Sequence, residues 1–315
     1  MFALRGVAVS LSVFVVIYGV MSLLVSFTWK RIQSRVKHQR MCRVADVLYA
    51  IRMLPLATGI IITTVFVVPS FLMLEPRAID EPLGRVPLIL GLCGAIALTL
   101  GAVNVAFAIR RALRTISQWM SGAQSVQSFA RLPVLTISPA APRMTAIGIL
   151  RPRILVSGST EFLLEERELQ TALNHEIAHV RRYDNLKKLM LRLVAFPGMR
   201  PLEDAWLNAT EMAADDAAVS NAGEALDLAA ALIKLSYLAP EEQPAELAMS
   251  LLRNPASTIN DRVKRLIHWS KEPDTEQKPT FWYALGAGAA VVATLAATYG
   301  YLLVQVHSAT EWLVR

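Results

Sequence analysis

The sequence is poor in cysteine and in charge. Only two of its 315 residues are cysteines, Cys42 and Cys93, so neither a disulfide framework nor a thiolate metal site is expected. Charged residues make up 18% of the chain and hydrophobic residues 54%, and the mean hydropathy is +0.41. This balance is unusual for a soluble globular protein and favours a membrane protein.

Four apolar runs contain no charged side chain. Each is 21 to 26 residues long, which is enough for a helix to cross a hydrocarbon layer of roughly 30 Å. The first run is too long for the core of a signal peptide, and a basic cluster follows it where a cleavage site would lie. We therefore predict four transmembrane helices, at residues 6–29, 54–74, 86–109 and 281–306.

The positions of basic residues predict the orientation. The stretch "KRIQSRVKHQRMCR", residues 30–43, has six basic residues and no acid, and "RRALR" follows the third run directly. By the positive-inside rule both stretches are cytoplasmic. We expect three spans within residues 1–109, a cytoplasmic domain at 110–280, the fourth span and a short tail at 307–315. Both termini would then be extracytoplasmic, in a cytoplasmic membrane of bacterial type.

The net charge of +7 and the pI of 9.6 do not indicate a nucleic-acid partner. Residues 1–109 hold ten basic residues against four acids, whereas residues 110–280 are almost balanced. Since the excess lies in the membrane part, the expected partner is the lipid bilayer, and no direct nucleic-acid binding is expected.

The segment 110–280 combines short strands with helices. The pieces "LPVLTIS", "TAIGIL" and "RILVSG" predict strands between residues 131 and 158. Apolar spacings of three and four then predict one long helix over 161–196 and further helices over 202–221, 224–239 and 260–269. The predicted fold class is mostly α, with four transmembrane helices and an α+β domain between spans three and four.

The stretch "NHEIAHVRRYDN", residues 174–185, carries the chemistry. On a helix His175 and His179 share one face and can bind one metal ion, and Glu176 lies at the edge of that face. This is the arrangement of a zinc hydrolase; the alternative is a pair of exposed helix histidines. Asp184 is expected on a different face from His179, in a structural ion pair with an arginine.

A catalytic zinc usually has three protein ligands, so a third is needed. In "NATEMAADDAAV" Glu211 is followed one turn later by Asp215, and the alanines between them allow a close helix approach. Glu211 is the predicted ligand, and Asp215 is expected to accept the second N–H of a ligating histidine. Asp204 and Asp216 are the alternative ligands.

Three of these stretches together resemble a known family. "GILRPRILVSGSTEFL", "LQTALNHEIAHVRRYDN" and "EMAADDAAV" are similar to the integral-membrane zinc metallopeptidases of the BlaR/MecR antirepressor type. The resemblance implies a zincin-like (gluzincin) domain and one Zn²⁺ per chain, held by His175, His179 and Glu211. It also implies that Glu176 is the catalytic base and that the strand at 153–156 binds substrate backbone by strand addition.

The resulting prediction is a membrane-embedded zinc endopeptidase in regulatory signalling. Its substrate would be a cytoplasmic or membrane-adjacent protein, such as a transcriptional repressor. Members that sense β-lactams carry a penicillin-binding domain after the last span, where this sequence has nine residues, so a direct antibiotic sensor is not expected. The candidates for a second oxyanion donor are Tyr183, Arg262 and His268.

Two other readings remain open. One is a quality-control peptidase of the HtpX or CAAX prenyl-protease type, which shares the H-E-x-x-H motif and a downstream glutamate. The other is a non-catalytic membrane relay or scaffold. A zinc transporter is less favoured, because the two histidines lie outside the four apolar runs.

Overall fold

The structure is a computed structural model. It describes residues 2–36, 39–76, 84–120, 124–129, 132–137, 144–149, 151–193, 196, 198–237, 249–250, 256–269 and 281–314. Most of the predicted loop between spans two and three lies outside these residues. The chain divides into two compact units, which are described separately below.

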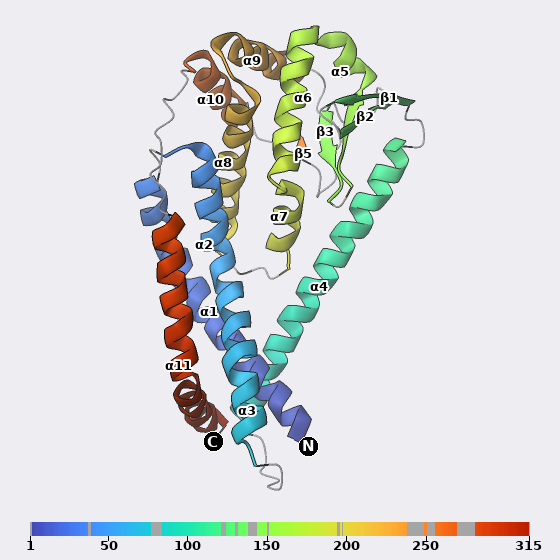
Figure 1. Cartoon of the computed structure of the whole chain (residues 1–315). Helices are drawn as coiled ribbons and strands as arrows, with labels where there is room; N and C mark the ends of the chain where they lie inside the picture. Colours follow the sequence, from blue (N-terminus) through green and yellow to red (C-terminus); the bar gives the residue numbers. More distant parts are fainter. Residues whose placement is uncertain are drawn as a thin grey trace. The chain divides into compact units, whose positions relative to one another are not determined.

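The first unit consists of Met1–Phe27, Met53–Leu100 and Glu272–Arg315. It contains parts of the long helices in Figure 1, which are α1 (Phe2–Val36), α2 (Met41–Ile62), the π-helical turn η1 (Thr63–Val67), α3 (Val68–Leu74), α4 (Arg85–Met120) and α11 (Phe281–Val314). Among the residues that the structure describes, three helical stretches are long and apolar enough to cross a membrane, at Phe2–Arg35, Met41–Leu74 and Arg85–Trp119. They correspond to the first three predicted spans. The fourth predicted span lies within α11 and stays a prediction.

The first unit packs in the manner of a membrane bundle. A Cβ on Gly91 would lie 2.8 Å from the carbonyl oxygen of Ala8, so this glycine lets α4 approach α1 closely. The buried hydroxyl of Ser12 lies 2.6 Å from the carbonyl oxygen of Pro87. Large apolar side chains such as Leu92 are exposed on the outside. Small and hydroxyl-bearing residues at helix contacts with an apolar exterior are typical of helices packed within lipid.

The second unit consists of Thr28–Arg52 and Gly101–Lys271 and contains a mixed sheet of order β1-β2-β4-β3-β5. Its strands are β1 (Gln124–Phe129), β2 (Leu132–Ile137), β3 (Met144–Ile147), β4 (Arg153–Ser157) and β5 (Met249–Ser250). Strands β2 and β4 are parallel, and the other pairs are antiparallel. The three predicted strands are confirmed as β2, β3 and β4, whereas β1 was not predicted because its sequence, "QSVQSF", is largely polar.

The strand at 153–156 does not have the free edge that substrate addition requires. It is β4, which pairs with β2 on one side and with β3 on the other. The prediction that this strand binds substrate backbone by strand addition is therefore wrong, because both of its hydrogen-bonding edges are already used within the sheet.

The predicted helix over 161–196 is also wrong as one element, because the chain forms three. These are α5 (Gly158–Leu163), α6 (Glu166–Arg181) and α7 (Asp184–Leu191), and α6 and α7 are separated at Tyr183, whose φ is +55°. A left-handed residue ends the run of α-helical hydrogen bonds. The other three predicted helices are present as α8 (Arg200–Ala218), α9 (Ala222–Ser236) and α10 (Ala256–Ile267).

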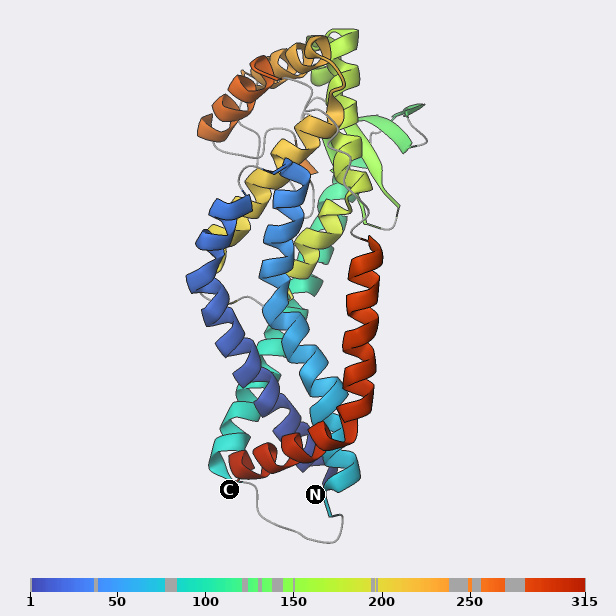
Figure 2. The same ribbon diagram turned by 60° about the vertical axis from the view of Figure 1, so that its left-hand side comes forward.

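Helix α6 lies at the centre of the second unit. It packs against β3 and β4 on one side and against α8 and α9 on the other, as Figures 1 and 2 show. The core includes Val156 of β4, Ile177 of α6 and Leu232 of α9, each with at most 3% of its surface exposed. Since both sides of α6 are covered, the polar groups His175, Glu176 and His179 in its second half are withdrawn from water.

The first turns of α2 also belong to the second unit. Ala45 and Leu48 are fully buried, and Arg52 contacts the Oε1 atom of Glu203 at 2.8 Å and the carbonyl oxygen of Leu191 at 3.4 Å. Thus part of α2 packs with the helices that carry the site, although the assignment of 110–280 as the complete cytoplasmic domain stays a prediction.

Candidate metal centre

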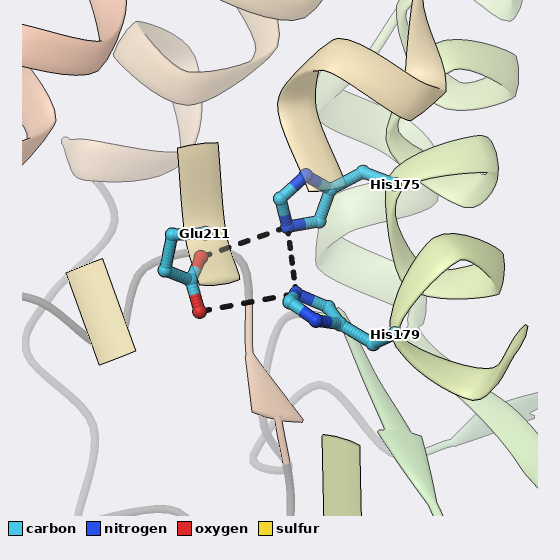
Figure 3. Close-up of side chains that lie close together, drawn as sticks. All are labelled: His175, His179 and Glu211. Carbon is cyan, nitrogen blue, oxygen red and sulfur yellow. Dashed lines mark hydrogen bonds and ion pairs between the residues drawn. The ribbon is translucent and has the colours of Figure 1, made fainter. Parts of the chain in front are cut away.

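The two motif histidines lie side by side on α6. Residues Glu165 and Glu168 form a capping box that begins the helix, and the four-residue spacing then places His175 and His179 one above the other. Both side chains are buried. Their Nε2 atoms are 3.1 Å apart and point toward the same position (Figure 3).

Glu211 of α8 completes the group. Its Oε2 atom lies 3.6 Å from Nε2 of His175, and its Oε1 atom lies 3.8 Å from Nε2 of His179 (Figure 3). The neighbouring Ala213 and Ala214 are buried and have no bulk that would hold α8 away from α6. The rival ligands are placed elsewhere: Asp204 is exposed, and Asp216 pairs with Arg265 at 2.6 Å.

Each histidine has a carboxylate at its other ring nitrogen. Oδ1 of Asp215 lies 3.0 Å from Nδ1 of His175, at ion-pair distance, and its role in orienting this ring stays a prediction. Oδ2 of Asp184 lies 2.8 Å from Nδ1 of His179, so the expectation that Asp184 faces away from His179 is wrong. The left-handed Tyr183 separates α6 from α7, so Asp184 begins a new helix and its position does not follow from the periodicity of α6. The expected arginine is present but more distant: Nε of Arg182 is 3.8 Å from Asp184.

Arg262 of α10 joins two of the carboxylates. Its Nε and Nη2 atoms donate to Asp215 at 2.7 and 2.6 Å, and its Nη1 atom donates to Oε2 of Glu211 at 3.0 Å. Burial alone would raise the pKa values of both carboxyl groups, but Arg262 and His175 lower them below their ordinary values. Arg262 is therefore engaged behind the ligands, whereas the two other oxyanion candidates, Tyr183 and His268, are exposed.

Glu176 is held by a strand. Its Oε2 atom accepts the backbone N–H of Ala146 in β3 at 2.7 Å, while its Oε1 atom is buried and has no partner among the described residues. Burial raises the pKa of Glu176, and His179 and His175 partly offset this. The result is a carboxylate with one fixed oxygen and one oxygen left to take a proton.

These residues fit a zinc ion. The carboxylates at both Nδ1 atoms favour the tautomer with the proton on Nδ1, so each Nε2 presents a lone pair. With both rings neutral, the lone pairs of His175 and His179 and the Glu211 carboxylate converge at separations of 3.1 to 3.8 Å. The ligand atoms of a tetrahedral zinc with N and O ligands are about 3.3 Å apart. The geometry thus accepts a zinc-sized cation with three protein ligands.

The pKa of His175 reflects the negative charge of the carboxylates around it. Burial by itself lowers this pKa, but Asp215 and Glu211 outweigh it and raise the pKa to about 9. A position that binds a proton this tightly is strongly favourable for a cation.

A buried His-His-Glu group lies beside a second glutamate, and the described part of the chain has three apolar helices of membrane-spanning length. Together these features define the class of membrane zinc metallopeptidases. A family model described as BlaR1 peptidase M56 matches residues 83–266. The match covers more than half of the chain, which therefore belongs to this family of zinc metallopeptidases. No curated protein matches the chain.

The sequence prediction missed two neighbours of the ligands. Asp184 was visible in the motif but was assigned to the wrong helix face, because the break at Tyr183 was not foreseen. Arg262 was considered as an oxyanion donor, and nothing in the sequence indicated that α10 would place it against Glu211 and Asp215.

Proposed function

We propose that this protein is a zinc-dependent endopeptidase that cleaves a cytoplasmic or membrane-adjacent protein in a regulatory pathway of the BlaR/MecR type. The observation that carries the proposal is the convergence of His175, His179 and Glu211 with the free oxygen of Glu176 beside them. The family match supports peptide hydrolysis as the reaction. One Zn²⁺ per chain would be held by His175, His179 and Glu211.

The chain's own residues have separate roles in this proposal. When bound, zinc supplies Lewis acidity that lowers the pKa of a coordinated water and stabilises negative charge on the substrate oxygen. Glu176 accepts the proton of the attacking water at Oε1 and passes it to the leaving amine, while the Ala146 N–H holds Oε2. The N–C bond of the peptide breaks, and one water molecule is consumed.

The carboxylates behind the histidines orient the two rings. Asp215 and Asp184 keep the Nδ1 protons of His175 and His179 in place, so both Nε2 atoms stay available. Arg262 fixes Asp215 through two hydrogen bonds and restrains Glu211 through a third.

The proposed topology has residues 110–280 in the cytoplasm, with four spans and both termini outside. Its support is the basic stretch at 30–43 and the "RRALR" after the third span. Reporter fusions at Thr275 and after Arg315 should give opposite sidedness. The same sidedness for both fusions would reject this topology.

The decisive experiment compares cells that express the native chain with cells that express the Glu176→Gln variant. Membrane and cytoplasmic proteins are searched for N-termini that require the native chain. Loss of a processed regulator supports the proposal, whereas loss of processing in misfolded membrane proteins or lipidated peptides favours a quality-control peptidase. If Glu176→Gln leaves every N-terminus and the cellular response unchanged, a non-catalytic relay is the better account.

A further inference from the structure

Asn185 is a buried residue beside the site that the mechanism does not use. It is the second residue of α7, directly after Asp184, and 7% of its surface is exposed. Its Nδ2 atom donates to the carbonyl oxygens of Ala146 at 3.1 Å and Gly148 at 3.2 Å. Because only the nitrogen of the amide can donate to two carbonyls, these contacts fix the orientation of the side chain.

The strand residue that Asn185 holds is the one that holds Glu176. Ala146 accepts from Asn185 through its carbonyl oxygen and donates through its N–H to Oε2 of Glu176. A continuous hydrogen-bonded path therefore runs from Asn185 through one residue of β3 to the glutamate. No atom of this path is the ligand of a metal in the proposed site.

Strand β3 is paired over different lengths on its two edges. One edge pairs with β4 over four residues, whereas on the other edge, among the residues that the structure describes, Thr145 and Ala146 pair with β5. The two hydrogen bonds from Asn185 reach Ala146 and also Gly148, which follows the end of the strand and has φ +86°. They add to the strand pairing at Ala146 and extend the restraint to Gly148, which has no strand partner among the described residues.

We propose that Asn185 is a positioning residue, which holds β3 so that the Ala146 N–H fixes one oxygen of Glu176 and leaves the other directed at the reacting water. The inference rests on the proposed function, because it takes Glu176 as the base. It makes Asp184 and Asn185 a pair of adjacent residues with different tasks: Asp184 orients a metal ligand, and Asn185 orients the base.

The test uses the zinc-loaded full chain and acetohydroxamate. This probe is small enough to need no specificity pocket, and it binds zinc while giving its acidic proton to a neighbouring carboxylate. Replacing Asn185 by alanine should weaken acetohydroxamate binding by roughly 3 to 10-fold, the equivalent of one hydrogen bond, with zinc content unchanged. In a Glu176→Ala background the same replacement should have no further effect.

Two further variants control the measurement. Asn104→Ala removes an amide that donates to the carbonyl oxygen of Arg192 at 3.3 Å, away from Glu176, and should bind the probe like the native chain. Asn185→Asp keeps the shape of the side chain but replaces the donor, so it should weaken binding as the alanine variant does. Asn185→Asp replaces Asn185→Ala in the binding measurement if the alanine variant does not fold.

The outcomes separate this inference from the proposed function. An equal loss in the native and Glu176→Ala backgrounds, or no loss at all, would overturn the role of Asn185. If the zinc-loaded native chain does not bind acetohydroxamate, the proposed function fails. Amide hydrogen exchange of residues 144–149 then tests separately whether Asn185 restrains β3. Exchange there should be roughly 3 to 10-fold faster in Asn185→Ala than in the native chain, and unchanged exchange would reject the inference.

Discussion

Asp184 lies 2.8 Å from Nδ1 of His179, although a helix break separates the two residues. The Asp184 carboxylate is fully buried and directs the opposite nitrogen of the ring toward Glu211. Asp215 does the same for His175 at 3.0 Å. Both histidines are thus oriented by carboxylates from outside α6.

Replacing Asp184 by asparagine should weaken zinc affinity by roughly 10 to 100-fold, because the ring loses a charged hydrogen-bond acceptor at Nδ1. Asp215→Asn should have an effect of similar size through His175. A competition titration with a chromophoric chelator measures both. The control is Asp46→Asn, because Asp46 contacts Arg182 and Lys187 near Asp184 but its side chain is 59% exposed. Native affinity in Asp184→Asn would show that Asp184 does not orient His179.

The ligand assignment predicts which single replacements remove the metal. Alanine at His175, His179 or Glu211 should abolish most zinc binding in the purified chain, measured as metal per protein after dialysis. The exposed Asp204 and the Arg265-paired Asp216 are matched controls on the same helix as Glu211. If zinc is lost on replacing either control and kept in Glu211→Ala, the third ligand has been assigned wrongly.

Local patterns were sufficient to predict that His175, His179 and Glu211 form one buried group. The positions of His175 and His179 follow from helical periodicity, and the spacing of Glu211 and Asp215 with alanines between them follows from the same rule. The three spans and the three inner strands were likewise predicted from apolar runs and β-branched segments.

Contacts that depend on tertiary structure were not predictable in this way. Nothing in the local sequence indicates that a tyrosine would adopt φ +55°, so Asp184 was placed by extending the helix. Arg262 reaches Glu211 from 51 positions along the chain, and the Ala146 N–H reaches Glu176 from a separate strand. Such pairs are defined by the packing of α10 and β3 against the helices.

Arg262 should be important for stability because it is buried with the carboxylates it binds. Arg262→Met removes both hydrogen bonds from Arg262 to Asp215 and leaves this buried carboxylate with His175 alone. Loss of one partner of a buried pair costs about 3 to 5 kcal/mol. Thermal unfolding should show this loss, and it should be larger with a chelator present, since zinc supplies positive charge to the same group. Arg265→Met is the control one turn away: the Arg265–Asp216 pair is about one third exposed, and its loss should cost at most about 1 kcal/mol. Equal effects of the two replacements would contradict this prediction.

Zinc affinity should depend on pH through His175. The pKa of His175 is raised to about 9, so in the metal-free protein zinc displaces a proton at neutral pH. Apparent affinity should rise about tenfold per pH unit up to about pH 9 and then level off. The metal-free protein should lose stability in the opposite direction: the charged imidazole is stabilising below its unfolded pKa of about 6.5, and this contribution is lost as pH rises through about 9.

Asp215→Asn is the control for this pH dependence. It removes a carboxylate that raises the pKa of His175, so the rise in zinc affinity should end at a lower pH. Isothermal titration in buffers of different ionisation enthalpy counts the protons released. Binding without proton release at pH 7 in the native chain would show that His175 is already neutral there.

Glu176→Gln separates catalysis from metal binding. Glutamine can still accept the Ala146 N–H, so the fold and the zinc content should stay native. It cannot take a proton from water, and the rate of cleavage should fall by roughly 10² to 10⁴-fold. Burial raises the pKa of the native Glu176, so its activity should decline as the pH falls through that value and the base becomes protonated. The measurements are the zinc content of the purified chain and the rate of product formation from the processed protein that the N-terminal comparison identifies. A zinc-loaded Glu176→Gln protein that cleaves this substrate at a near-native rate would remove Glu176 as the base, while a variant that has lost its zinc would show that Glu176 helps to hold the metal.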